Sequence, residues 1–276
     1  AILSGLVGSE MCIRDRPAEP SGGAWNQVHV GSNGDLFAFS QSGIFTLNTA
    51  GTGWTLEQAS GTSNWPSGGP EETFEHNGII YAAIIGGGVG RWDVSSMSPL
   101  APWSTANNLH SDDISGFAVA GNQLLISSYD AGIARRDLSS NFWLATWNNG
   151  NWLSSNDVKG MAVVNSDILI LADSTVHTYD TNSGTFTTTT SLSSIGQMNG
   201  GQNIIHWPAM GSRSPNNDTV LVTDGGAVFA MLEPGNNPLY TGDFVIGSSP
   251  SSGDMTDAMQ FDGVIYVAVS YTHLTL

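Results

Sequence analysis

The sequence has one cysteine, few charged residues and no long apolar run, and each shortage excludes a class of protein. The single cysteine, Cys12, cannot form an intramolecular disulfide or a metal site built from several thiolates. Charged residues make up 11% of the chain, whereas the solvent faces of long helices usually carry many lysines and glutamates. Because no apolar run reaches about 18 residues, we expect no membrane insertion.

The charges that are present are mostly negative. The chain has 24 acidic and 7 basic residues, which gives a formal net charge of −17. An acidic surface repels phosphate backbones and anionic lipid headgroups, so nucleic acid and membrane surfaces are excluded as partners. Solubility is the simplest reason for an acidic surface, and cation binding is the alternative.

The remaining composition favours β-structure. Apolar residues make up 40% of the chain, which is enough for a packed core. Gly, Ser, Thr and Asn are abundant, and no window of twelve residues follows the 3.6-residue period of a helix. Many short strands joined by turns explain this mixture, so we predict an all-β fold.

A repeat of about 44 residues organises the chain. Six predicted second strands share an early apolar residue, found at Leu36, Ile80, Leu124, Ile168, Val220 and Val264. Their spacings are 44, 44, 44, 52 and 44 residues. One insertion of about eight residues therefore separates the fourth and fifth units, and residues 211–218 have the composition of such a loop. The acidic residue ending each third strand repeats similarly, at Asp93, Asp137, Asp180 and Glu233.

Four short strands in about 44 residues is the period of a β-propeller blade. We predict a partial propeller of five four-stranded blades and a truncated sixth. The blades cover residues 24–57, 71–104, 114–147, 158–189 and 202–246, and the sixth begins at residue 255. Aromatic residues near the fourth strands are expected to pack between blades. A β-helix and a β-sandwich are the alternatives, but neither is expected to keep a 44-residue register.

Both ends of the chain look foreign to this repeat. Residues 9–16 and 269–276 resemble translated sequencing-adapter text, which occurs at the edges of environmental (metagenomic) assemblies. We therefore expect residues 1–16 to be an artefact or disordered, and residues 269–276 to be an artefact. The propeller domain is assigned to residues 17–268, as a fragment of a larger ring or protein.

Two units carry a more specific motif. The segment LHSDDI at Leu109–Ile114 is followed by Ser115-Gly116 and then FAVAGNQLLISSYDAGIARRDL, and LSSNDV at Leu153–Val158 repeats its start. This pattern resembles the propeller repeats in sensor domains of two-component regulators. The resemblance implies a propeller with a sensing or binding role and supplies no catalytic residues. We expect an exported protein, extracellular or at the cell surface.

Five candidate binding residues lie in the predicted loops that lead into first strands. Asp112, Asp113 and Asp157 could contribute oxygen ligands to calcium, or could accept hydrogen bonds that shape the loops. Trp65 and Trp152 could stack on sugar rings or anchor a protein partner, or could cover the edge of the core. Both interpretations of each set remain open from the sequence.

The sequence contains no catalytic motif. His29, His76 and His206 fall on or beside predicted first strands, but they do not share a repeat position, so we predict no metal-ligating set. We therefore predict a non-catalytic binding or scaffold propeller that recognises a protein or a glycan through its loop face, with calcium the one cofactor left open. The alternative is a propeller enzyme, a glycan hydrolase or lyase, with its site in a central funnel.

Overall fold

The chain divides into two units, residues 1–114 and 115–276, which are described separately. The computed structural model describes residues 25–48, 50–192, 203–207, 219–223, 228–232, 240–243, 255–261 and 264–269. The predicted artefact at residues 1–16 and the insertion at residues 211–218 lie outside the described residues. The second predicted artefact also lies outside them, except Val269, which is the last residue of a strand.

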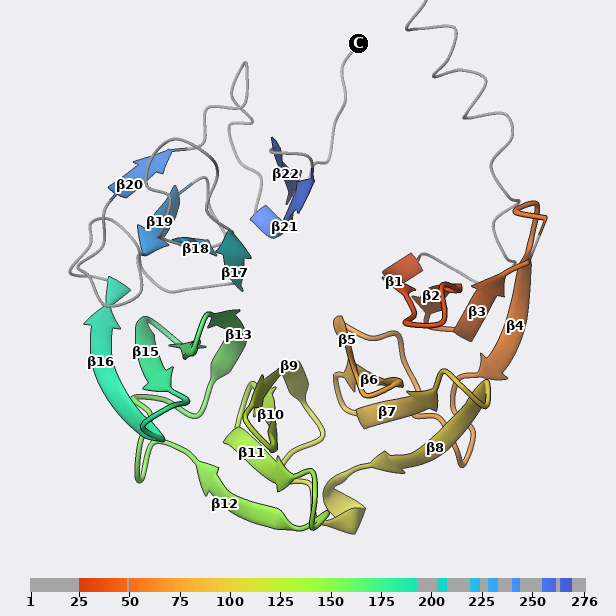
Figure 1. Cartoon of the computed structure of the whole chain (residues 1–276), viewed down its shortest axis with the longest axis horizontal. Coiled ribbons are helices and arrows are strands. Elements are labelled where there is room, and N and C mark those ends of the chain that lie inside the picture. Colours follow the sequence, from red (N-terminus) through yellow and green to blue (C-terminus); the bar gives the residue numbers. More distant parts are fainter. Residues whose placement is uncertain are drawn as a thin grey trace, which may run out of the picture. The chain divides into compact units, whose positions relative to one another are not determined.

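The first unit contains two four-stranded antiparallel sheets among its described residues, and in each sheet sequence neighbours pair (Figure 1). The strands of one sheet are β1 (Trp25–Val30), β2 (Leu36–Ser40), β3 (Gly43–Leu47) and β4 (Trp54–Ala59). Those of the other are β5 (Glu72–His76), β6 (Ile79–Ile84), β7 (Gly88–Asp93) and β8 (Ser98–Trp103). A short 3₁₀-helix, η1 (Thr105–Asn107), follows β8.

The described part of the second unit contains three four-stranded sheets and one two-stranded sheet. The strands of the first sheet are β9 (Ile114–Ala120), β10 (Gln123–Ser128), β11 (Gly132–Asp137) and β12 (Trp143–Trp147). Those of the second are β13 (Val158–Val164), β14 (Asp167–Ala172), β15 (Thr175–Asp180) and β16 (Thr185–Ser191). The third four-stranded sheet contains β17 (Asn203–Trp207), β18 (Thr219–Thr223), β19 (Val228–Leu232) and β20 (Tyr240–Asp243). The two-stranded sheet contains β21 (Met255–Phe261) and β22 (Val264–Val269). The predicted four-stranded blades are confirmed, although β4 and β16 each end two residues later than expected.

The acidic residues that end three of the third strands, Asp93, Asp137 and Asp180, each make a turn, and Glu233 lies outside the described residues. In the hairpin between β11 and β12, the carboxylate of Asp137 accepts hydrogen bonds from the amides of Ser140 at 2.7 Å and Ser139 at 3.0 Å. These bonds favour the ionised form and lower the pKa of Asp137. Asp93 and Asp180 accept amide hydrogen bonds in the same way, and their pKa values are also lowered. The acidic repeat therefore has a structural cause, an Asx-type turn.

The core of the first unit lies between its two sheets. The second strands β2 and β6 are buried along nearly their whole length. Phe39 and Ile44 from one sheet form a cluster with Ile80 and Trp92 from the other. Each sheet therefore buries a face against its neighbour, as stacked repeats must do.

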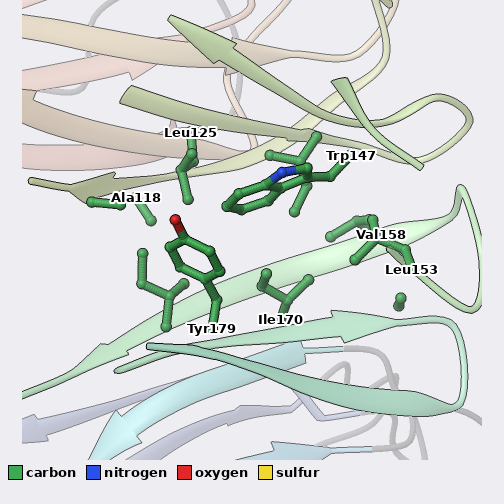
Figure 2. Packing of buried hydrophobic residues seen from close by; sticks show 11 residues of the cluster. Ala118, Leu125, Trp147, Leu153, Val158, Ile170 and Tyr179 are labelled. Carbon is green, nitrogen blue, oxygen red and sulfur yellow. The ribbon is translucent and has the colours of Figure 1, made fainter. Parts of the chain in front are cut away.

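The second unit repeats this packing between the sheets β9–β12 and β13–β16. Figure 2 shows Leu125 and Trp147 of one sheet facing Ile170 and Tyr179 of the other. The rings of Trp147 and Tyr179 lie 4.5 Å apart between centroids, and Phe186 on β16 packs edge-on against Trp147 at 5.0 Å. The predicted role of the fourth-strand aromatics in packing between blades is therefore confirmed at Trp147 and Phe186.

One pair of charges in the second unit opposes stability. Asp167 on β14 pairs directly across the sheet with Asp180 on β15, and burial and the Asp180 charge together raise the pKa of Asp167. We expect Asp167→Asn to raise the free energy of unfolding at neutral pH by about 0.5 kcal/mol, because like charges opposite each other in a sheet repel. Urea unfolding of the two proteins measures this difference.

The pH dependence provides the control for that substitution. Because the pKa of Asp167 is higher in the folded chain, the folded state takes up this proton first as the pH falls. The penalty from Asp167 is therefore present at neutral pH and disappears in acid. A gain from Asp167→Asn that stayed constant from neutral to acid pH would contradict this explanation.

Candidate functional site

The candidate residues lie in loops that connect the fourth strand of one sheet to the first strand of the next. Residues 60–71 and 104–113 are the connecting loops of the first unit, and residues 148–157 form the corresponding loop between β12 and β13 in the second. The structure brings Asp112 and Asp113 together in one loop and Trp152 and Asp157 together in another. Trp65 lies in the third.

The two aspartates of loop 104–113 are occupied by hydrogen bonds within the first unit. The carboxylate of Asp112 accepts from the amide of Thr105 at 2.8 Å and from its hydroxyl at 2.7 Å. The carbonyl of Asp112 accepts from the amide of Gly88 at 2.9 Å, and the carboxylate of Asp113 accepts from the amide of Gly86 at 2.8 Å. These contacts tie the loop to the turn between β6 and β7.

The loop 148–157 repeats this arrangement 44 residues later. The side chain of Asn156, at the position equivalent to Asp112, accepts from the amide of Asn149 at 2.9 Å. Its carbonyl accepts from the amide of Gly132, also at 2.9 Å. Because an amide and a carboxylate make the same contacts at equivalent positions, these contacts need an acceptor oxygen rather than a charge. The polar residues of the motif therefore shape the loops.

Asp157 has a different environment from its counterpart Asp113. Its Oδ2 forms an ion pair with Lys159 Nζ at 2.8 Å, while Oδ1 is buried and accepts no hydrogen bond from the described residues. Nowhere in the described ranges do three or more His, Cys, Asp or Glu residues gather in a possible metal site. Calcium binding by Asp112, Asp113 or Asp157 stays a prediction.

Trp65 is a core residue. Its side chain is 1% exposed and stacks on Phe39, with ring centroids 6.3 Å apart. Gly90 gives the indole its space, because a Cβ at that position would lie 2.7 Å from the Trp65 ring. The expected ligand contact at Trp65 is not available, since this ring is covered. The alternative of core packing describes Trp65 correctly.

A repeat relation that the sequence already contained explains the burial of Trp65. Trp65 stands 44 residues before Leu109, and Leu109 stands 44 residues before Leu153. All three are buried, with 1%, 3% and 6% exposure. Trp65 therefore occupies the position of the motif leucine. We related the two leucines to each other in the sequence but did not extend the relation back to Trp65.

Trp152 is exposed and precedes the equivalent leucine by one residue. Its side chain is 57% exposed and lies nearly parallel to Phe186, at a centroid distance of 5.7 Å and an interplanar angle of 13°. Phe186 is in turn held edge-on by Tyr179 at 5.3 Å. Phe186 therefore covers one face of the Trp152 indole, while much of the side chain remains accessible to solvent.

His177, on β15, is a feature of this site that sequence reasoning did not identify. Its side chain is 4% exposed, and its Nε2 lies 3.1 Å from the amide nitrogen of Ser154 in loop 148–157. β15 is buried at four consecutive positions, so no alternation of apolar and polar residues in the sequence singles out His177. A histidine satisfied by hydrogen bonds, rather than a metal ligand, is the expected kind of residue here, but its partner in loop 148–157 is not evident from the sequence.

The two histidines on first strands of the first unit, His29 on β1 and His76 on β5, have side-chain hydrogen-bond partners. His29 lies 3.1 Å from Glu75, whose carboxylate also accepts from the amide of Ser32 at 3.0 Å. Burial raises the pKa of Glu75, but hydrogen bonds from Ser32 and His29 outweigh it and leave the pKa below its ordinary value. His76 hydrogen-bonds to the side chain of the next residue. The side chain of His206 lies outside the described part of the chain.

Comparison with known proteins identifies the fold and no family. No protein-family model matches the sequence, and no curated protein matches it. Among solved structures, the extracellular domain of BT4673 from B. thetaiotaomicron, described as part of a hybrid two-component system, matches 93% of this chain with a TM-score of 0.70 and 12% identity. The extracellular domain of BT3049 from the same organism, described in the same way, matches 93% with a TM-score of 0.65 and 13% identity.

A propeller of another class, the WD40 type, also matches most of this chain in structure. The WD40 β-propeller domain of Doa1 matches 91% of this chain, and 77% of its own chain is covered, with a TM-score of 0.61 and 13% identity. This chain spans about a third of the length of the BT4673 and BT3049 domains, 35% and 33%. The identities are low, so the likeness concerns the fold. The chain has the β-propeller fold and resembles the extracellular sensor propellers of two-component systems.

Proposed function

We propose that this chain is a non-catalytic binding module that recognises a protein or a glycan through loop 148–157, with Trp152 as the contact residue. The observation that carries the proposal is the combination of exposure and support at Trp152. A ring that is 57% exposed and stacked on Phe186 offers contact area while losing little conformational entropy on binding.

The differences between repeats support the choice of Trp152. The residue 44 positions earlier is Asn108, which has a left-handed backbone with φ of 73°, as the residue after η1. The polar residues of loop 148–157 match those of loop 104–113, whereas the tryptophan does not. A residue that the repeat does not require is available for a function of its own.

The fold is consistent with an extracellular binding role. The BT4673 and BT3049 domains are described as extracellular domains of hybrid two-component systems, and we extend the extracellular or cell-surface location to this chain as part of the proposal. Within the described ranges, no helix has the length and hydropathy needed to cross a membrane. No arrangement of the described residues favours the alternative of a glycan hydrolase or lyase.

The test begins with a ligand screen and ends with two matched variants. We expect the purified chain to bind at least one member of an array of neutral and acidic oligosaccharides and of extracellular-domain proteins. Trp152→Ala should weaken that binding at least about tenfold, as expected for loss of an aromatic anchor. Phe142→Ala is the control, because Phe142 is also exposed, at 72%, but lies in the turn between β11 and β12.

Circular dichroism and thermal unfolding of both variants check that the fold is retained. A ligand whose affinity is unchanged by Trp152→Ala, or is reduced equally by Phe142→Ala, would reject Trp152 as the contact residue. Turnover of a bound glycan by the wild-type chain would favour the enzyme alternative over a binding module.

A further inference from the structure

The buried imidazole of His177 connects two elements that position Trp152. On one side, Nε2 lies 3.1 Å from the amide nitrogen and 3.0 Å from the hydroxyl of Ser154, two residues after Trp152. On the other side, Nδ1 lies 3.2 Å from the hydroxyl of Thr189 on β16. His177 therefore ties the loop that carries Trp152 to the outer strand of the sheet β13–β16.

The same imidazole also supports the ring under Trp152. His177 packs edge-on against Phe186, at a centroid distance of 6.3 Å and an interplanar angle of 88°. Phe186 is the ring on which Trp152 stacks. One titratable side chain therefore contacts both the loop that carries Trp152 and the ring on which Trp152 stacks.

The hydrogen bonds determine the protonation state that this arrangement needs. A backbone N–H can only donate, so the Ser154 amide requires an unprotonated Nε2 as its acceptor. The proton of the neutral ring is then on Nδ1, which can donate to the Thr189 hydroxyl. A second proton on Nε2 would remove the bond from the Ser154 N–H, and the hydroxyl of Ser154 at 3.0 Å is the one acceptor that these contacts leave for it.

Among the described residues, no nearby charge compensates a protonated His177. β16 carries no charged residue, and the charged residue of loop 148–157, Asp157, is paired with Lys159. On β14, Asp167 pairs with Asp180 rather than with His177, which is opposite Ile170. The turn between β14 and β15 contributes Asp173, which is exposed to solvent. Burial, with no contribution from a charged neighbour, lowers the pKa of His177.

We propose that neutral His177 is the positioning residue that holds loop 148–157 and Trp152 in place, and that its protonation in acid releases them. Its value as a regulator of ligand binding rests on the function proposed for Trp152. The release itself is a property of the loop and is measurable without a ligand.

The sign of the pH effect follows from linkage. The ordinary pKa of histidine is about 6.5, and in the held loop the pKa of His177 lies below that value. A released or unfolded loop therefore takes up the proton at higher pH than the held loop does. The stability of the held loop is complete above the ordinary pKa and decreases as the pH falls toward the lowered one.

The experiment is an NMR titration of the wild-type chain in the absence of ligand, from neutral to about pH 5. We expect the imidazole ¹⁵N signals to show Nδ1 protonated and Nε2 unprotonated at neutral pH. The amide signal of Ser154 and the indole N–H signal of Trp152 should then shift with the same inflection as His177. In His177→Gln, which offers an acceptor that does not titrate, both inflections should disappear.

Two results would overturn the proposal. One is a ring that carries its proton on Nε2 at neutral pH, which the wild-type spectrum shows even if the variant does not fold. The other is a Ser154 amide that keeps its signal while His177 titrates. Loss of ligand binding in Trp152→Ala is a separate measurement, so failure of the binding function and failure of the release are distinguishable.

Discussion

Trp65→Ala is expected to lower the free energy of unfolding by about 3–5 kcal/mol, the range for truncating a buried large aromatic. Trp65 is 1% exposed and lies in the cluster between the two sheets of the first unit. Its removal leaves a cavity beside Phe39 and Gly90, and Gly90 has no side chain that could fill it. Urea unfolding followed by circular dichroism measures the loss.

Trp152→Ala is the matched control for this prediction. It removes the same side chain from a loop of the same class, but at 57% exposure. We expect a loss of less than about 1 kcal/mol, because surface substitutions rarely cost more. Equal losses of unfolding free energy in the two variants would contradict the stabilisation that we assign to the burial of Trp65.

The second large effect is expected at Gly132, the first residue of β11. Its φ is 86°, and a Cβ on it would overlap the carbonyl oxygen of Trp147 on the neighbouring β12. Gly132→Ala should therefore cost about 3 kcal/mol or more, because it adds a steric clash with the backbone to the strain of a positive φ. Gly43 and Gly88 open β3 and β7 with the same close approach.

Gly121→Ala separates the two contributions at Gly132. Gly121 also has a positive φ, 57°, but nothing lies within 4 Å of the position that its Cβ would take. We expect a loss of about 1 kcal/mol there, from strain alone. Thermal or urea unfolding of both variants should show the larger loss at Gly132, and the reverse order would contradict the close approach.

The architecture was predictable because it repeats. Landmarks such as Leu124 and Ile168 recur on second strands that are buried in every described copy with known side chains. Asp93, Asp137 and Asp180 recur because each closes a turn by accepting amide hydrogen bonds. A local pattern of this kind needs no knowledge of distant residues, so periodicity alone predicts the blades and their turns.

The candidate site was less predictable because similar residues in similar loops have different surroundings. Trp65 and Trp152 both follow an asparagine in a connecting loop, yet one position faces the core and the other faces solvent. Their positions differ by one residue relative to the motif leucine, and this single step decides burial. Comparison with Leu109 and Leu153 could have separated the two tryptophans.

His177 shows what lies beyond sequence reasoning. Nothing local indicates that a histidine on β15 accepts a hydrogen bond from Ser154, which is 23 residues earlier. The contact exists because loop 148–157 folds back over the end of the sheet that follows it. Its partners on β16 and in the loop meet only after the sheet has formed.

The sequence by itself determined the all-β architecture, the 44-residue blade and the turns between strands, because these depend on short-range patterns and on backbone geometry. The tertiary structure decided which loop residues are exposed and which are held by contacts with other parts of the chain. Asp112 and Asp113 accept amide hydrogen bonds, Trp65 is covered by a neighbouring sheet, and Trp152 remains exposed on Phe186. Burial and pairing arise from segments that are distant along the chain.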